Sequence, residues 1–154
     1  MLSNINYRAK TDVSKMVFPI RKPQQLINRS NKYPIIYFKT GKCRIMGCKE
    51  IIKASEYNVY DLEIQSITVT SDIGFSCNLN KLAKLIPCFY EPELFPALRY
   101  IKYNPMCVNI FASGKIVILG IKNIDYKCIV DNIISEIKSI IEGKEFLDFL
   151  LSLN

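Results

Sequence analysis

Phe38-Lys-Thr-Gly-Lys-Cys-Arg-Ile-Met-Gly-Cys-Lys49 returns later in the chain as Phe111-Ala-Ser-Gly-Lys-Ile-Val-Ile-Leu-Gly-Ile-Lys122. Six of the twelve positions are identical, and the copies lie 73 residues apart. Each copy places a Ser/Thr-Gly-Lys turn between two apolar runs, which is typical of a tight β-hairpin because glycine adopts positive φ without strain. A duplicated hairpin at a fixed spacing predicts a fold of two related halves.

A weaker repeat pairs Leu2-Ser-Asn-Ile5 with Ile64-Gln-Ser-Ile67, at an offset of 62 residues. The two offsets differ by 73 − 62 = 11. The first half is therefore expected to lack about eleven residues between Leu2–Ile5 and the hairpin Phe38–Lys49. The predicted division is a reduced first repeat over residues 1–60 and a fuller second repeat over residues 61–154 that carries an extra C-terminal helix.

The helical patterns are stronger in the second half. From Asp125 to Ile141 apolar residues recur every three or four positions, with Gly143 as a candidate C-cap. Asn78 is a candidate N-cap for a shorter helix that reaches Ile86, before Pro87.

Two further helices are expected from what remains of the chain. After the first hairpin only Glu50 to about Tyr57 is available for a helix. The apolar tail Phe146–Leu153 predicts a terminal helix, which either covers sheet surface left bare in the first half or presents an apolar patch to a partner.

The composition narrows the possible functions. There are 21 Lys and Arg against 14 Asp and Glu, a net charge of +7, which suits a polyanionic partner, although a generally basic proteome produces the same balance. Histidine is absent, and with it the usual general base and the commonest metal ligand. The six cysteines form no C-x-x-C pair, and the Gly-Lys turns lack the P-loop pattern. We therefore expect no enzyme activity, no metal and no cofactor.

The sequence also bears on location. No apolar run reaches the length of a signal peptide or the roughly 20 residues of a membrane span. Unpaired cysteines are the default in reducing compartments. An intracellular protein without a membrane partner is expected.

Tyr90-Glu-Pro-Glu-Leu-Phe-Pro96 resembles the Y-E-P-E-L-F-P segment in the second repeat of the TATA-box-binding protein family. Phe111–Lys122 is similar to the family's I-F-x-S-G-K-x-V-x-T-G-A-K hairpin, and Ile64–Ile67 to its I-Q-N-I strand. The resemblance covers the second repeat nearly completely and the first in part. It implies an α+β fold, a two-repeat saddle whose curved antiparallel sheet carries helices on its convex face.

The resemblance implies a general transcription initiation factor, acting in the nucleus or the cytoplasm. Such a protein recognises A/T-rich, TATA-like promoter DNA in the minor groove, bends it, and recruits a transcription factor IIB-like protein and RNA polymerase. The alternative is a related fold that serves as a protein-interaction module of a transcription complex, with little binding to free DNA.

Three phenylalanines match the family's wedges, which enter between base steps and kink the duplex. Phe95 and Phe111 match the pair of the second repeat, and Phe38 matches the hairpin wedge of the first. The competing interpretation is ordinary core phenylalanine. Phe95 stands between Leu94 and Pro96 in a predicted loop, where burial is less natural.

A fourth wedge is left open by two alignments of the first repeat. Phe18-Pro19 either echoes Phe95-Pro96, or precedes a short helix over Pro23–Ile27. The second alignment, which we favour, places the eleven-residue loss in the first DNA-facing loop. In the family this loop meets transcription factor IIA, so that contact is expected to be weak or lost.

Further residues are assigned by the resemblance to the groove floor and its edge: Asn4, Thr40, Arg44, Met46, Ser66, Ser113, Val117 and Leu119. Three depart from the family. Met46 and Leu119 each stand where the family has a threonine, and Ser66 stands where it has the asparagine that Asn4 retains. With fewer polar contacts to the bases, recognition should depend more on the shape and deformability of the DNA. For Asn4, a role in forming a turn is an equal alternative to contact with DNA bases. Arg44 is unusual because it places a positive charge on a face that is expected to be apolar.

Six cations are candidates for phosphate contact: Lys42, Lys49, Lys115, Lys122, Arg99 and Lys102. Four of them recur in register in the two hairpins, although any single lysine is commonly only a solvated charge. Phosphate contacts position a protein and make its affinity fall with salt. Glu91, Glu93 and Leu94 lie in the loop that meets transcription factor IIB in the family, and acidic residues there suit a basic protein partner.

Overall fold

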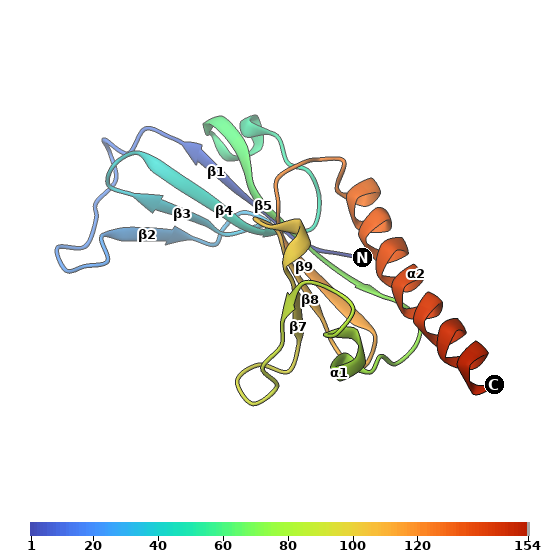
Figure 1. Ribbon diagram of the computed structural model, residues 1–154. Coiled ribbons are helices and arrows are strands. Elements are labelled where there is room, and N and C mark those ends of the chain that lie inside the picture. The colour runs from blue at the N-terminus through green and yellow to red at the C-terminus, as the bar shows by residue number, and fades with distance from the viewer. Residues whose placement is uncertain (154) are drawn as a thin grey trace. The chain divides into compact units, whose positions relative to one another are not determined.

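The computed structural model describes residues 1–153, except for the side chains of residues 145 and 146 (Figure 1). It separates into two compact units, Leu2–Thr68 and Val69–Asn154 with Met1. The strands hydrogen-bond in the order β2-β3-β4-β1-β5 and then β5-β9-β8-β7-β6, so β5 (Tyr60–Asp72) takes part in both series. Because the units divide within this strand, the repeat boundary at residues 60 and 61 stays a prediction.

The first unit shows the period-two alternation of strands that bury one face. It contains β1 (Leu2–Lys10), β2 (Gln25–Asn28), β3 (Ile35–Phe38) and β4 (Lys42–Cys48). In β1 the side chains of Ile5, Tyr7 and Ala9 are buried, whereas Arg8 and Lys10 are exposed. One face is therefore an apolar core and the other is free for binding.

The apolar face of the first unit is covered by irregular backbone. The helix expected over Glu50–Tyr57 is wrong: only the 3₁₀-helix η1 (Ala54–Tyr57) forms, since Lys53 before it is extended and Asn58 after it is left-handed. The Tyr57 hydroxyl accepts a hydrogen bond from the backbone N–H of Tyr33 at 3.3 Å. The Tyr7 hydroxyl likewise accepts from the Ile52 N–H at 3.4 Å, so buried tyrosines satisfy backbone groups of this irregular segment and of the chain before β3.

The short helix expected over Pro23–Ile27 is also wrong. Residues 25–28 form β2, which pairs antiparallel with β3 and places Gln25 opposite Phe38. A helix this short is unstable on its own, whereas the edge of β3 offers hydrogen-bonding partners. Tertiary pairing therefore overrides the local pattern.

Strand β2 also locates the missing residues. Its first residue, Gln25, lies 73 positions before Leu98, the first residue of β7 (Leu98–Tyr100). The two hairpins are separated by the same 73 residues, so β2 corresponds to β7. Fourteen residues separate β1 from β2, whereas 25 separate β5 from β7. The longer segment contains α1 (Leu79–Leu82) and β6 (Cys88–Phe89). The described residues of the shorter segment form neither helix nor strand.

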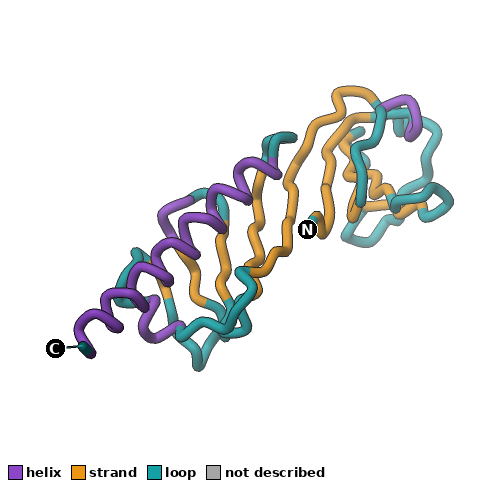
Figure 2. Tube along the Cα trace, turned by 90° about the vertical axis from the view of Figure 1, so that its right-hand side faces the viewer, coloured by secondary structure: helices purple, strands orange, loops and turns teal. Residues whose placement is uncertain are grey.

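The second unit packs one long helix, α2 (Tyr126–Ser152), along strands β7, β8 (Cys107–Ile110) and β9 (Lys115–Ile121) (Figure 2). Val130, Ile133 and Ile137 of α2 are buried, as the three-and-four spacing predicts. Ile116 and Ile118 of β9 are buried in the same core. The opposite sheet face is left open.

The helix boundaries differ from expectation in two places. Helix α2 runs through Gly143 and absorbs the predicted terminal helix, so Gly143 is not a C-cap. An interior glycine costs about 1 kcal/mol, which the following turns offset, including an i,i+4 ion pair between Lys144 and Asp148 at 3.1 Å. Asn78 does cap α1, accepting from the Lys81 N–H at 3.1 Å, but the α-helix ends at Leu82.

The C-terminal turns of α2 expose apolar side chains: Leu147, Phe149, Leu150, Leu151 and Leu153. The side chain of Phe146 and residue 154 lie outside the described part of the chain. Whether this tail covers sheet of the first half or contacts a partner stays a prediction.

Tyr100 links β7 to α2. Its side chain is 2% exposed, and its hydroxyl donates to Glu136 Oε1 at 3.0 Å. Burial, followed by the hydrogen bond to Glu136, raises the pKa of Tyr100 to about 12. Because the unfolded phenol ionises near its ordinary pKa of 10.0, this contribution to stability is complete below pH 10 and is lost as the pH rises through 12.

We expect Tyr100→Phe to lower the free energy of unfolding by about 1 kcal/mol at neutral pH through loss of this hydrogen bond. The variant should also lose less stability than the wild type between pH 10 and 12. Urea denaturation at several pH values measures both effects. Tyr60→Phe, at a side chain 56% exposed, is the control and should change neither. Identical alkaline stability in wild type and Tyr100→Phe would contradict the assignment.

Candidate nucleic-acid interface

The two predicted hairpins are present, with their turns at the expected glycines. In the second unit the Gly114 N–H donates to the Phe111 carbonyl at 2.9 Å, and in the first the Gly41 N–H donates to the Phe38 carbonyl at 3.0 Å. Both glycines have positive φ, 93° and 86°. Each turn therefore places its phenylalanine at the end of the incoming strand.

Phe95 and Phe111 form an aromatic pair although they come from different segments. Their ring centroids lie 6.2 Å apart at an interplanar angle of 68°, an edge-to-face contact. Phe95 is 45% exposed, and its loop is closed by N–H groups of Leu94 and Phe95 that both donate to the Glu91 carbonyl at 3.0 Å. The pair is thus held in position while remaining partly open to solvent, unlike a core phenylalanine.

The first unit differs at the equivalent place. Phe38 is half-buried, and the guanidinium carbon of Arg44 lies 5.7 Å from the centroid of its ring. At the offset of 73, the residue that corresponds to Phe95 is Lys22, which is exposed. Phe18 is half-buried within the segment between β1 and β2. Phe38 therefore has a cation beside it where Phe111 has a second aromatic ring.

The open face of the second unit is mainly apolar. Val117 and Leu119 of β9 lie opposite Asn109 and Cys107 of β8, and Arg99 of β7 lies opposite Asn109. Leu119 is 37% exposed, whereas Asn109 is buried and its Oδ1 accepts from the Cys107 thiol at 3.5 Å. This face combines apolar surface with a cation on β7, next to the edge strand β6.

Sequence reasoning missed several members of this face. Asn109 and Cys107 precede Phe111 on β8 by two and four residues, so strand alternation could have identified them. Phe89, an exposed ring on β6, lies opposite Arg99. Its two-residue strand carries too little pattern to be predicted.

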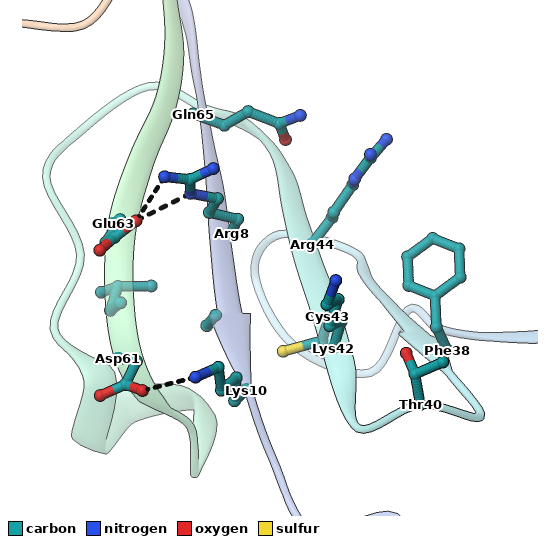
Figure 3. A pocket seen from close by; sticks show the side chains of 12 residues that line it. Arg8, Lys10, Phe38, Thr40, Lys42, Cys43, Arg44, Asp61, Glu63 and Gln65 are labelled. Carbon is teal, nitrogen blue, oxygen red and sulfur yellow. Dashed lines mark hydrogen bonds and ion pairs between the residues drawn. The ribbon is translucent and has the colours of Figure 1, made fainter.

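The open face of the first unit is charged. Arg8 and Lys10 of β1 lie directly opposite Arg44 and Lys42 of β4. With residues of β3 and β5 they line a groove of about 740 Å³ (Figure 3). Sequence reasoning found Lys42 and Arg44 but missed Arg8 and Lys10, because their importance depends on the pairing of β1 with β4.

Strand β5 adds two carboxylates to this groove. Glu63 Oε2 lies 2.7 Å from the Arg8 guanidinium, and Asp61 Oδ2 lies 3.1 Å from Lys10 Nζ. The hydrogen bond to Asp61, followed by its charge, raises the pKa of Lys10. Figure 3 shows the two ion pairs bridging β1 and β5, while Arg44 and Phe38 lie farther along the groove. Met46 of β4 is half-buried.

Asn4 lies within β1 and not in a turn, so the turn-forming interpretation is wrong. Its Oδ1 is buried and has no hydrogen-bonding partner among the described residues. Ser66 is half-buried on β5. A buried acceptor without a partner is energetically costly, which makes Asn4 a candidate for pairing with a ligand.

The candidate phosphate-binding cations are not equivalent. Lys42, Arg99, Lys115 and Lys122 are exposed, as are the turn residues Thr40 and Ser113. Lys49 donates to the Ser3 carbonyl. Lys102 pairs with Glu136 of α2, which places it toward the helix-covered side of the second unit.

The loop before β7 presents the candidate partner residues. Glu91, Glu93 and Leu94 are all exposed, and the Leu94 side chain is 80% exposed. An exposed apolar side chain next to exposed carboxylates is a feature of protein-binding surfaces.

Among the described residues, no group of three or more potential ligands could hold a metal ion. No helix within residues 1–153 has both the length and the apolar character needed to cross a membrane.

The chain is similar to proteins of one family. A family model described as "Transcription factor TFIID (or TATA-binding protein, TBP)" matches residues 61–140. The TATA-box-binding protein of Methanothermococcus thermolithotrophicus is 33% identical over 129 residues, which cover 72% of this chain and 71% of that protein. That of Methanococcus aeolicus is 33% identical over 109 residues, and the match spans 60% of its length.

A solved structure supports the same relationship. "Methanococcus jannaschii TBP" superimposes with a TM-score of 0.70 and 28% identity, covering 90% of this chain and 97% of that one. Fold and sequence together define an α+β protein whose fold is similar to that of TATA-box-binding proteins. The chain belongs to the TATA-binding protein family. The fold class expected from the sequence is thereby confirmed.

The Gly114 turn positions the Phe111 side of the interface. A Cβ at Gly114 would lie 2.2 Å from the Phe75 carbonyl oxygen, whereas a Cβ at Gly74, at a similar φ of 91°, would meet nothing within 4 Å. We expect Gly114→Ala to destabilise the protein by at least about 3 kcal/mol and Gly74→Ala by about 1 kcal/mol. Urea denaturation of both variants measures the difference. Equal losses would contradict a steric role for the Gly114 turn.

Proposed function

We propose that this protein is a transcription initiation factor that binds A/T-rich promoter DNA in the minor groove and bends it, without catalysis of its own. The observation that supports this most is the Phe95–Phe111 pair, a partly exposed aromatic wedge at the end of an apolar sheet face. Inserting such side chains between base steps unstacks and kinks the duplex at a cost of a few kcal/mol per step. Contact with the bent DNA offsets that cost, which is lowest at flexible TA steps.

The rest of the second-unit face suits the same role. The minor groove offers few hydrogen-bonding distinctions, so a face that contains Val117 and Leu119 is adequate for A/T preference. The exposed cations Arg99 and Lys115 are available for phosphate contact. The first unit contributes Phe38 and the unpartnered Asn4 acceptor. We therefore propose that the bend is strongest at the end of the site bound by the second unit.

We expect Phe95→Ala and Phe111→Ala each to weaken binding to an A/T-rich duplex about tenfold or more, as loss of base–aromatic contacts of 1–3 kcal/mol implies. The bend, measured by energy transfer between labels at the duplex ends, should decrease. Titrations at several salt concentrations on A/T-rich and G·C-rich duplexes separate a preference for A/T-rich base steps from electrostatic attraction to the phosphates. Phe149→Ala, on the exposed tail of α2, is the matched control. No bend at saturating wild-type protein would overturn the proposal.

We further propose that the loop before β7 recruits a transcription factor IIB-like protein and, through it, RNA polymerase. Glu91, Glu93 and Leu94 combine exposed negative charge with an exposed apolar side chain. The shortened segment between β1 and β2 is the basis for proposing that the contact with transcription factor IIA is weak or lost.

The charge reversal Glu91→Lys/Glu93→Lys should weaken the ternary complex of duplex, protein and factor IIB about tenfold or more, because like charges would then face a basic partner. Affinity for DNA alone should not fall. Gel-shift titration with purified factor IIB compares the two, and Glu142→Lys on α2 is the control. Unchanged ternary binding would contradict the assignment of this loop.

The charged face of the first unit supports a second candidate function. Two carboxylates on the open face disfavour DNA, which agrees with a protein-interaction module of a transcription complex. That function predicts negligible affinity for free duplex at physiological salt. Partner assembly would then survive Phe95→Ala and Phe111→Ala, which distinguishes it from the DNA-binding function.

A further inference from the structure

The groove of the first unit contains an arrangement of charges that DNA binding does not require. Four cations, Arg8, Lys10, Lys42 and Arg44, lie on adjacent strands, and the β1 and β4 pairs are in direct register. Asp61 and Glu63 of β5 line the same groove. We call these six residues the charged face.

The carboxylates of the charged face engage only its β1 cations. Arg8 contacts Glu63 Oε2 through two nitrogens, at 2.7 and 2.8 Å, and Lys10 contacts Asp61 at 3.1 Å. Arg44 instead lies over the Phe38 ring. Lys42 has no carboxylate partner among the described residues. Among the described residues, the charged face therefore presents two cations without a carboxylate partner and two that are paired with carboxylates.

These ion pairs contribute little to folding. Their side chains are more than half exposed, and exposed ion pairs are screened by water and stabilise a fold only weakly. Their larger effect is on the electric field that an approaching polyanion meets, because each carboxylate adds repulsion and occupies a cation that could contact phosphate.

We propose that Asp61 and Glu63 determine how the first unit engages DNA, by pairing with Arg8 and Lys10 and so weakening the attraction of the charged face for phosphates. This inference rests on the proposed DNA-binding function and refines it. Engagement is led by the second unit and its aromatic wedge, and the first unit docks weakly. Asp61 and Glu63 thereby act as restraints on DNA affinity.

The test is the double variant Asp61→Asn/Glu63→Gln. Both changes keep the side-chain shape and remove the charge. Asn also tolerates the φ of 51° at residue 61, because Asp and Asn are the residues that most readily adopt this conformation. The matched control, Glu50→Gln/Glu56→Gln, removes two exposed charges of the same unit outside the groove.

Binding to an A/T-rich duplex is measured by fluorescence anisotropy from 50 to 300 mM salt. Freeing two cations should raise affinity about tenfold at low salt and steepen the slope of log K against log salt by about 1.8, or 0.9 per added phosphate contact. Hydroxyl-radical footprints should lengthen at one end of the site. The control should change the affinity less than about twofold and leave the footprint unchanged.

The outcomes separate this inference from the proposed function. If wild type binds and the double variant matches it in affinity and slope, the role of Asp61 and Glu63 is overturned while DNA binding stands. If only the double variant binds, the restraint is confirmed and free-duplex binding by the wild type is overturned. If neither protein binds, both proposals fail.

Discussion

The cross-strand register set by the two glycine turns is the constraint on which the rest of the structure depends. Gly41 and Gly114 take positive φ, so each turn closes tightly and pairs its strands in one register. Because side chains alternate along a strand, a shift by one residue would exchange the two faces. The register of the two turns therefore directs the isoleucines of these strands into the core. It leaves four residues outside the core: Phe38, Arg44, Phe111 and Val117.

Both units have this hairpin register, but the apolar face of the sheet is covered differently in each. The second unit buries its sheet under α2, with Tyr100 joining strand to helix. The described segment between β1 and β2 of the first unit forms neither a helix nor a strand, and the core of this unit is covered by the segment around η1 and by Tyr7, Tyr33 and Tyr57. The large aromatic area of tyrosine buries the core while its hydroxyl satisfies backbone groups of irregular chain. The sheet of the first unit therefore forms without a covering α-helix among the described residues of that unit.

The open faces have diverged further than the cores. In the second unit two aromatic rings contact each other, whereas in the first an aromatic ring contacts a cation, and ion pairs replace apolar surface. Core positions are constrained by volume and by the absence of water. Exposed faces tolerate charge at little cost to folding, so binding properties can change while the fold persists. A protein with two related halves can in this way assign them unequal roles.

The sequence by itself determined the duplication, the hairpins, the main helix and the family, because each rests on a pattern that local physics enforces. It also predicted binding roles for Phe95, Phe111 and the loop at Glu91, which lie in the segments that most resemble the family. It mispredicted a helix at Pro23–Ile27 and an end of α2 at Gly143, where strand pairing and helix continuation overrode local signals. Only the tertiary structure decided that Arg8 and Lys10 face Arg44 and Lys42 and pair with Asp61 and Glu63. These residues lie up to 55 positions apart, and no local pattern specifies which strands become neighbours.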